Sequence, residues 1–163
     1  MKSILFVCMG NICRSPVVEA VARAQFARAG VAIQVASAGL ESYHVGQPAD
    51  RRAIASAGAH GYDLSAHRAR RIDAAMFAAF EHVLVMDRLN LRELRDVGLA
   101  QMQRAQLFLP FAGVDGASEV PDPYYGGASD FERVIELAEA GVRGLISRAA
   151  MAHNDGMPSG SIA

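Results

Sequence analysis

The sequence predicts an α/β fold, a three-layer sandwich in which about four parallel strands carry helices on both faces. Apolar runs typical of strands alternate with helical patterns along most of the chain, and this alternation favours a parallel sheet. The first three segments, a strand, a helix and a second strand, have the length of a right-handed βαβ unit. Ligands of such sheets bind beyond the carboxyl ends of the strands, so the loop after the first strand is the first candidate for a site.

The composition is that of an ordinary globular protein. The 163 residues are 52% apolar and 20% charged, which is enough to build one substantial core. We expect one domain over residues 1–150 and a flexible tail over 151–163, where the helical pattern decays. The net charge of −1 gives no reason to expect nucleic acid or an anionic membrane surface as the main partner.

The N-terminus and the cysteines predict the compartment. No apolar run approaches the ~20 residues that cross a bilayer, and the apolar residues before Cys8 are fewer than the ~7–15 of a signal peptide. We therefore expect a cytoplasmic protein without membrane insertion. Cys8 and Cys13 are the two cysteines and lie in one loop, so they cannot form a structural framework. In a reducing compartment they are expected to be reactive thiols.

The first βαβ unit is predicted from its local signals. Residues 4–7 are β-branched, aliphatic or aromatic, which suits a buried strand. A helix is predicted over 16–29, with Ser15 as its N-cap, Pro16 as its first residue and Gly30 as its stop. A second strand is predicted over 31–37, and residues 40–50 are loop-like.

The later elements continue the alternation of helices and strands. Helices are predicted over 49–57, with Gly58 as the stop, and over 73–80 and 89–97. Strands are predicted over 82–86 and 107–109, with Pro110 directly behind the second of them.

The last helix has the clearest pattern. Ser129 and Glu132 have the spacing of a capping box. Gly141 and Gly144 inside the helix indicate close packing, since each costs up to about 1 kcal/mol relative to Ala. One helical arc carries the apolar residues Phe131, Val134, Ile135, Ala138, Val142, Leu145 and Ile146.

The loop from Cys8 to Arg14 combines three chemical features. Gly10 and Asn11 tolerate unusual backbone angles, and the loop ends at a helix N-terminus, where free N–H groups and the helix dipole attract anions. The same field favours the thiolate form of Cys8. Arg14 adds a planar fork of donors that matches phosphate oxygens. A nucleophile, an anion cradle and a cation therefore converge, although a cysteine and an arginine separated by five residues are common by chance and a buried inert thiol is the default.

At this point the sequence resembles the low-molecular-weight protein tyrosine phosphatases, whose signature is Cys-x5-Arg-Ser directly after the first strand. The resemblance spans about residues 3–148. Five further stretches match that family in the same order, namely Ser37-Ala38-Gly39, His44-Val45-Gly46, Ala66-His67-Arg68-Ala69-Arg70-Arg71-Ile72, Met86-Asp87-Arg88-Leu89-Asn90-Leu91 and Asp122-Pro123-Tyr124-Tyr125-Gly126.

The resemblance implies a mechanism without a metal or another cofactor. Cys8 attacks phosphorus as a thiolate and forms a phosphocysteine intermediate. The Arg14 guanidinium and backbone N–H groups hold the phosphoryl oxygens; the backbone groups implied are those of Met9, Gly10, Asn11, Ile12, Cys13 and Arg14.

Asp122 is the candidate general acid and, in the second half-reaction, the base, because an aryl phosphate needs a proton for its leaving oxygen. Pro121 and Pro123 flank it and restrict its backbone. On its own, an Asp between two prolines is better interpreted as a surface turn. The match to the family motif reverses that preference.

The resemblance also implies supporting residues. Ser15, besides capping the helix, donates to the Cys8 thiolate, while Asn11, Ser37 and His67 fix the strained loop; without the resemblance, His67 would be interpreted as an ordinary half-buried histidine. We hypothesise that Cys13 traps an oxidised Cys8 as a disulfide, the alternative being that it is filler.

Three tyrosines are expected to line the mouth of the site and to grip a phenyl ring, although aromatic residues in loops are often edge packing. These are Tyr43, Tyr124 and Tyr125. Two positions depart from the family pattern, with Tyr43 where Trp is frequent and Leu40 where Thr is usual. Both bear on substrate preference.

Two other functions remain as alternatives. A thioredoxin-coupled arsenate reductase shares this loop but uses a further cysteine pair late in the chain, and this sequence has no cysteine after Cys13. A non-catalytic phosphate-binding module is disfavoured because Cys8, Arg14 and Asp122 occur together. The expected partner is a tyrosine-phosphorylated protein, which in bacteria is often a tyrosine kinase of polysaccharide export, and inorganic phosphate is the expected product and inhibitor.

Overall fold

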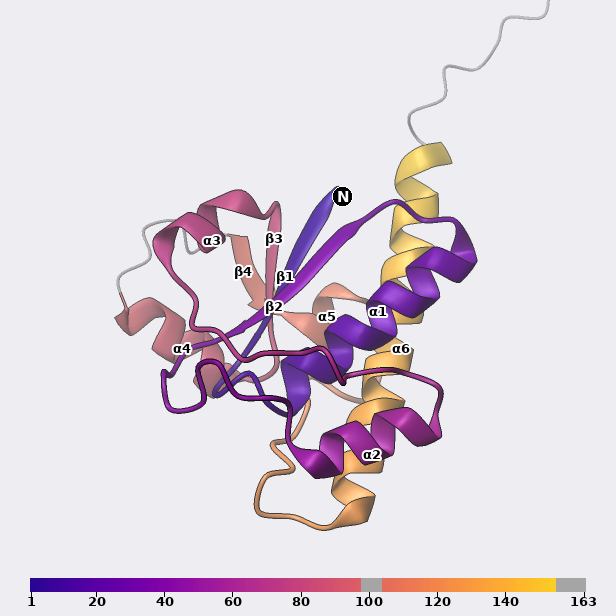
Figure 1. The fold of residues 1–163 in the computed structure, drawn as a ribbon. Coiled ribbons are helices and arrows are strands. Elements are labelled where there is room, and N and C mark those ends of the chain that lie inside the picture. The colour runs from indigo at the N-terminus through magenta and orange to yellow at the C-terminus, as the bar shows by residue number, and fades with distance from the viewer. Residues whose placement is uncertain (98–103, 155–163) are drawn as a thin grey trace, which may run out of the picture.

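The strands that the structure describes form one parallel sheet. The structure is a computed structural model that describes residues 1–97 and 104–154. The four strands are β1 (Ser3–Cys8), β2 (Gln34–Gly39), β3 (His82–Val85) and β4 (Ala105–Leu107), and they lie in the order β2-β1-β3-β4 (Figure 1). Every pairing is parallel, so the carboxyl ends of all strands meet at one edge.

Helices cover both faces of this sheet. The helices are α1 (Arg14–Ala29), α2 (Arg51–Ala59), α3 (Ala74–Ala79), α4 (Arg88–Asp96), α5 (Phe108–Phe111) and α6 (Ala128–Asn154). Ile4 and Phe6 of β1 belong to a core shared with α1, α2, α5 and α6. Leu5 and Val7 belong to a second core shared with α3 and α4. Successive strand residues point to opposite faces, so the predicted three-layer α/β sandwich is confirmed.

The start of α1 differs from its prediction. The helix begins at Arg14, and Cys13, not Ser15, occupies the N-cap position, without a side-chain hydrogen bond. Ser15 lies inside the helix, and its hydroxyl is bound to the Cys8 thiol and does not serve as a cap. Gly30 ends the helix in a left-handed conformation, as predicted.

The strand β2 lies later in the sequence than predicted. The Val31 N–H bonds back to Phe26 of α1, and sheet pairing starts where the Gln34 N–H meets the Lys2 carbonyl. The strand therefore runs over 34–39 and not over 31–37. The strand predicted over 107–109 also moves, to Ala105–Leu107, because the chain turns into α5 and Pro110 has no N–H to continue a ladder.

The remaining short elements are close to their predictions. Asp50, Asp73 and Asp87 cap α2, α3 and α4 with their side chains. These caps place the helix starts within two residues of prediction. Gly58 was expected to end α2 but lies inside that helix, which runs to Ala59 and is capped by His60.

The helix α6 lies along α1 and has the predicted apolar face (Figure 1). The predicted capping box is wrong, because Asp130 accepts the Gly127 N–H while Glu132 binds Ser56 of α2 and His60, the C-cap of that helix. Gly141 does allow close packing, since a Cβ there would overlap the ring of Phe108.

The helix α6 continues to Asn154, so residues 151–154 are helical. The flexibility expected for 151–163 stays a prediction. Strong helix formers, Ala149 to Ala152 among them, extend the helix beyond its packed part. The rest of the expected tail, 155–163, lies outside the described residues. Within the described ranges, no helix has the length and apolar character needed to cross a membrane.

Candidate active site

The phosphate loop, residues 8–14, leaves the carboxyl end of β1 and leads into α1. It is packed against the end of β2. A Cβ added to Gly39 would lie 2.9 Å from the Met9 carbonyl oxygen and 3.0 Å from the Asn11 nitrogen. The Leu40 N–H bonds the carbonyls of Cys8 and Met9 on the same side. The position of this loop is therefore set by direct contact with a neighbouring strand.

Cys8 is buried beneath this loop and is hydrogen-bonded to Ser15. Its side chain is 3% exposed, and its Sγ lies 2.9 Å from the Ser15 Oγ. The Asn11 amide donates to the same hydroxyl oxygen at 2.9 Å. Since an incoming N–H already occupies the oxygen, the hydroxyl hydrogen is free to point at the sulfur, and the Ala38 carbonyl is a longer alternative at 3.4 Å. The Ser15 hydroxyl can therefore donate a hydrogen bond to the Cys8 sulfur.

Asn11 holds the loop in a strained conformation. Its φ of 57° is the one positive value among the non-glycine residues that the structure describes, and asparagine tolerates this region better than most residues. The side-chain amide donates to Ser15 at 2.9 Å and to Ser37 at 3.0 Å, while its carbonyl oxygen accepts the Arg70 N–H. His67 Nε2 lies 2.7 Å from the Asn11 main-chain oxygen. Asn11, Ser15, Ser37 and His67 are thus in one network.

Glu19 and Arg23, which the sequence analysis missed, extend this network. The Ser37 hydroxyl donates to Glu19 of α1 at 2.5 Å, and the second oxygen of Glu19 pairs with Arg23. The hydrogen bond to Asn11 acts to raise the pKa of His67, but burial has the larger effect and lowers it. A glutamate one turn into a helix carries no signal of its own for this role.

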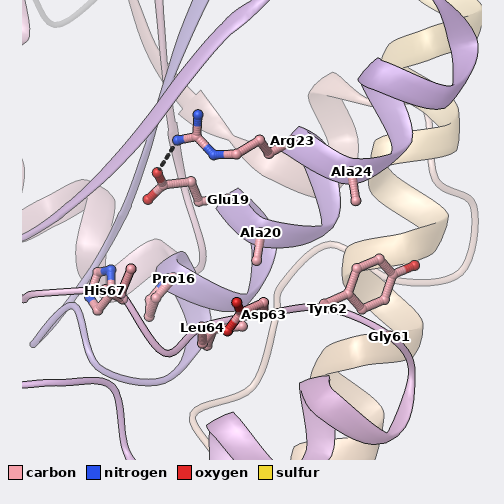
Figure 2. Close-up of a pocket in the computed structure, with 11 residues that line it drawn as sticks. Pro16, Glu19, Ala20, Arg23, Ala24, Gly61, Tyr62, Asp63, Leu64 and His67 are labelled. Carbon is pink, nitrogen blue, oxygen red and sulfur yellow. Dashed lines mark hydrogen bonds and ion pairs between the residues drawn. The ribbon is translucent and has the colours of Figure 1, made fainter.

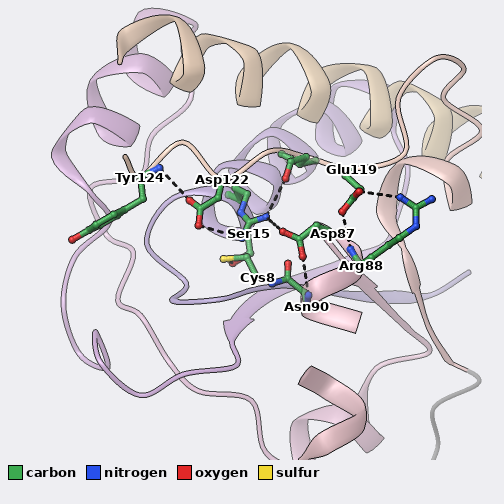
Figure 3. A network of polar contacts seen from close by, with 10 residues as sticks. Cys8, Ser15, Asp87, Arg88, Asn90, Glu119, Asp122 and Tyr124 are labelled. Carbon is green, nitrogen blue, oxygen red and sulfur yellow. Dashed lines mark hydrogen bonds and ion pairs between the residues drawn. The ribbon is translucent and has the colours of Figure 1, made fainter. Parts of the chain in front are cut away.

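Arg14 is fixed by acceptors from two later segments, one of which carries Asp87, labelled in Figure 3. It is 2% exposed, and its Nη1 donates to Asp87 at 2.5 Å and to the Val120 carbonyl at 3.0 Å. Burial acts to lower the pKa of Arg14, but the negative charges of Cys8 and Asp87 outweigh it and raise the pKa, so the guanidinium stays charged. Asp87, also missed from the sequence as a site residue, caps α4 as well; the signal was its position directly before a helix.

Asp122 lies on the opposite side of Arg14. Its side chain is half exposed and lies 3.7 Å from the Arg14 Nη2, and its other oxygen accepts the Tyr124 N–H at 3.1 Å (Figure 3). The following Pro123 is buried and anchors the turn. The carboxyl group is therefore held at the mouth of the site but stays in contact with solvent.

A cavity of about 220 Å³ joins these groups. Its floor is made by residues 8–10 and 12–14, and Asp122 contributes to its wall. Asn11 and Ser15 do not line it, because their side chains lie beneath the loop.

The rim of the cavity carries the three expected tyrosines and one unexpected residue. Tyr43, Tyr124 and Tyr125 are 73%, 38% and 97% exposed. His44 was not predicted as a site residue. Its ring packs over Gly10, whose added Cβ would lie 3.0 Å away, and its Nδ1 is 3.0 Å from Gln47. Leu40, which departs from the family pattern, is buried in the second core.

Cys13 lies in the floor as a free thiol, as does Cys8. Burial, followed by the negative charges of Asp50 and Cys8, raises the pKa of the Cys13 thiol far above its ordinary value. Burial thus keeps Cys13 as a neutral thiol. Its trapping of an oxidised Cys8 stays a prediction.

A larger cavity of about 570 Å³ lies elsewhere, between α1 and residues 61–67 (Figure 2). Polar side chains on its wall are already paired: Glu19 with Arg23 and Ser37, and Tyr62 with Gln25 and Glu139. It shares no lining residue with the cavity at Cys8. Among the residues described, no group of three or more His, Cys, Asp or Glu could hold a metal ion.

Comparisons with known proteins agree with this geometry. The family described as low molecular weight phosphotyrosine protein phosphatase matches residues 3–155. A low molecular weight protein-tyrosine-phosphatase of Streptomyces coelicolor is 39% identical over 150 residues, which cover 88% of this chain and 91% of that protein. The human low molecular weight phosphotyrosine protein phosphatase is 38% identical over 153 residues, which cover 91% of this chain and 96% of that protein.

Solved structures share the fold. A protein tyrosine phosphatase from Entamoeba histolytica, with Hepes in its active site, has a TM-score of 0.86 and 35% identity and covers 94% of this chain and 99% of its own. Vibrio vulnificus Wzb, in complex with benzylphosphonate, has a TM-score of 0.80 and 27% identity. The match covers 90% of this chain and 98% of that protein. With its fold, its phosphate loop and these relatives in agreement, this chain belongs to the low molecular weight phosphotyrosine protein phosphatase family.

Proposed function

We propose that this member of the family hydrolyses phosphotyrosine and other aryl phosphates with Cys8 as nucleophile, Arg14 as phosphate ligand and Asp122 as general acid and base. One observation carries the assignment. A buried sulfur and a charged guanidinium from the phosphate loop line the same cavity of about 220 Å³ as a solvent-accessible carboxyl group from a second segment. A buried inert cysteine needs neither of the other two groups.

In the first half-reaction, the Cys8 thiolate attacks phosphorus on the side opposite the leaving oxygen. The sulfur–phosphorus bond forms as the phosphorus–oxygen bond breaks, and Asp122 gives its proton to the departing phenolate. Arg14 and the backbone N–H groups of the phosphate loop balance the charge on the three remaining oxygens. The Ser15 hydroxyl stabilises the sulfur before the attack.

In the second half-reaction, water attacks the phosphocysteine. Asp122, now a carboxylate, takes a proton from this water, the sulfur–phosphorus bond breaks, and the Cys8 thiolate leaves as inorganic phosphate forms. Asp122 suits both roles because it is half exposed and hydrogen-bonded by a backbone N–H on one oxygen only. Phosphate, which fits the same cradle, is the expected product inhibitor.

The depth of the cavity supports an aromatic substrate. The sulfur is buried while Tyr43 and Tyr125 stand in solvent at the rim, so a phosphate must reach inward past the rim to meet Cys8. A phenyl ring spans that depth and packs against flat side chains, whereas phosphoserine holds its phosphate too close to its own backbone. The benzylphosphonate bound by the Vibrio vulnificus relative has this aryl shape.

The biological substrate we propose is a tyrosine-phosphorylated protein in the cytoplasm, such as a bacterial tyrosine kinase. Arsenate reduction is not favoured, because Cys8 and Cys13 are the two cysteines of the sequence and the further pair that this chemistry needs is lacking.

The test is hydrolysis of phenyl phosphate by the reduced full-length chain, without added metal. We expect turnover, its loss in Cys8→Ser, and a phosphorylated Cys8 peptide in the mass spectrum of a rapidly quenched reaction. Asp122→Asn should lose about 10²–10⁴-fold in kcat/KM, the usual contribution of a general acid. Asp115→Asn is the matched control, because Asp115 is exposed and outside the cavity. Undiminished turnover in Cys8→Ser would exclude the mechanism.

A further inference from the structure

Arg52, in the first turn of α2, contacts two residues, Asp50 and Tyr124, that are each hydrogen-bonded to a different part of the proposed catalytic site. Its guanidinium donates to both carboxylate oxygens of Asp50, at 3.0 and 2.8 Å, and to the Tyr124 carbonyl at 3.0 Å. The contacts use the planar fork of an arginine, with different nitrogens facing different acceptors. One side chain therefore joins the start of α2 to the loop that carries Asp122.

On one side, Arg52 is fixed to the phosphate loop through Asp50. The Asp50 carboxylate accepts the Arg52 backbone N–H as well as its guanidinium, so it is held from two directions. The Asp50 backbone N–H in turn donates to the Ile12 carbonyl at 2.9 Å. Since Ile12 lies inside the phosphate loop, the position of Asp50 follows that of the loop.

On the other side, Arg52 holds the acid loop, residues 121–126. Arg52 contacts Tyr124 a second time, beyond the hydrogen bond to its carbonyl. The ring of Tyr124 lies 5.6 Å from the Arg52 guanidinium carbon, within the range of a cation–π contact. The Tyr124 N–H donates to the Asp122 carboxylate. The ring of Phe131, at the start of α6, lies 4.7 Å away on the same guanidinium. Tyr124 is thus held by Arg52 at its carbonyl while it holds Asp122 at its nitrogen.

We propose that Arg52 is a positioning residue that sets the placement of the Asp122 carboxyl group relative to Cys8 by joining the phosphate loop to the acid loop. The inference rests on the proposed role of Asp122. Arg52 does not line the cavity and touches no reacting atom. Its side chain is 44% exposed, and ion pairs at such sites add little stability, so its removal affects the placement of Asp122 more than the fold.

The experiment compares two substrates that differ in their need for an acid. Phenyl phosphate has a strongly basic leaving group and depends on proton transfer, whereas 2,4-dinitrophenyl phosphate releases its phenolate without a proton. Arg52→Met should lower kcat/KM for phenyl phosphate about 10-fold, part of what a ~1 Å misplacement can cost, and should leave the dinitrophenyl substrate within about 2-fold. Arg51→Met is the matched control, since this exposed neighbour makes no ion pair in the described part of the chain.

A double-mutant cycle shows whether Arg52 acts through Asp122. In the Asp122→Asn background, Arg52→Met should change kcat/KM for phenyl phosphate by less than about 2-fold, because residues that act as a unit are not additive. Losses that multiply in the double variant, or equal losses for both substrates in Arg52→Met, would overturn the inference. If Asp122→Asn itself shows no preference between the substrates, the proposed role of Asp122 fails instead.

Two further variants and one physical measurement separate geometry from charge. Arg52→Lys keeps the charge but lacks the fork, so it should resemble Arg52→Met; full recovery of activity would show that charge alone suffices. Amide hydrogen exchange should become faster at 124–126 in Arg52→Met and stay unchanged in β1. Unchanged exchange in the acid loop would also count against the inference.

Discussion

Replacing Gly39 by alanine should damage catalysis although it adds only a methyl group. Gly39 ends β2, and its φ is outside the left-handed region, so alanine can adopt its backbone conformation. The obstacle is the phosphate loop. The new Cβ would lie 2.9 Å from the Met9 oxygen and 3.0 Å from both the Asn11 nitrogen and the Gly10 carbonyl carbon. All three are backbone atoms, which cannot turn away as a flexible side chain can.

The magnitude follows from these distances. Ordinary contacts of a Cβ begin at 3.4 Å, so the loop must retreat by about 0.4 Å or more, and overpacking of this kind costs about 1–3 kcal/mol. A displacement approaching 1 Å at a reacting group costs up to about 10²-fold in rate. We therefore expect kcat/KM for an aryl phosphate to fall about 10- to 100-fold and inhibition by inorganic phosphate to weaken in parallel.

The assay combines kinetics, phosphate inhibition and urea unfolding followed by circular dichroism. Gly58→Ala makes the same substitution in α2, where the added Cβ meets nothing within 4 Å; it should gain about 0.5–1 kcal/mol of stability and keep its activity. A Gly39→Ala variant with the activity and phosphate inhibition of the parent protein would refute the reasoning, because the loop would then not be set by its contact with β2.

Three other predictions follow from single contacts. Ser15→Ala should lower kcat/KM by about 10- to 100-fold, because a hydrogen bond to a charged group such as the Cys8 thiolate contributes about 1.5–3 kcal/mol; Ser15→Thr, which keeps the hydroxyl, is the control, and equal activity in both would contradict it. Gly141→Ala should lower the free energy of unfolding by about 1–3 kcal/mol, because the added Cβ overlaps the Phe108 ring. A higher urea midpoint in this variant than in the parent protein would contradict the prediction. The pKa of His67 is lowered in the folded protein, so the unfolded chain binds a proton at this histidine more readily. The contribution of His67 to the free energy of unfolding is therefore complete above about pH 6.5 and is lost as the pH falls below that value. Urea midpoints measured from pH 8 to 5 should fall less steeply in His67→Gln than in the parent protein, and parallel curves would exclude the effect.

The sequence predicted the layers because their signals are local. Strand patterns, helix stops and the apolar arc of α6 each occupy one stretch of chain, and the close packing inferred for Gly141 needed only its place in a helix. The resemblance to the family supplied the link from Cys8 to Asp122, which lie far apart in sequence. The structure places both side chains around one cavity.

The errors have a common physical cause, which is that tertiary contacts compete for the same side chains. Ser15 has the sequence of an N-cap, but its hydroxyl is used by Cys8. Glu132 has the spacing of a capping box, but its carboxylate is used by α2. Asp87 and Arg52 have ordinary local explanations, a helix cap and a solvated helix face. Their contacts to Arg14 and Tyr124 cross long stretches of chain that no local pattern records.

The contrast between the buried loop and its exposed rim has a consequence for how such enzymes diverge. Cys8 and Arg14 are 3% and 2% exposed, whereas Tyr43 and Tyr125 are 73% and 97% exposed. Substitutions at exposed positions usually change stability by no more than about 0.5 kcal/mol, so natural variation can alter the rim without unfolding the protein. Descendants of one ancestor can thus acquire different phosphoprotein clients through a few surface changes while the hydrolytic machinery is inherited unaltered.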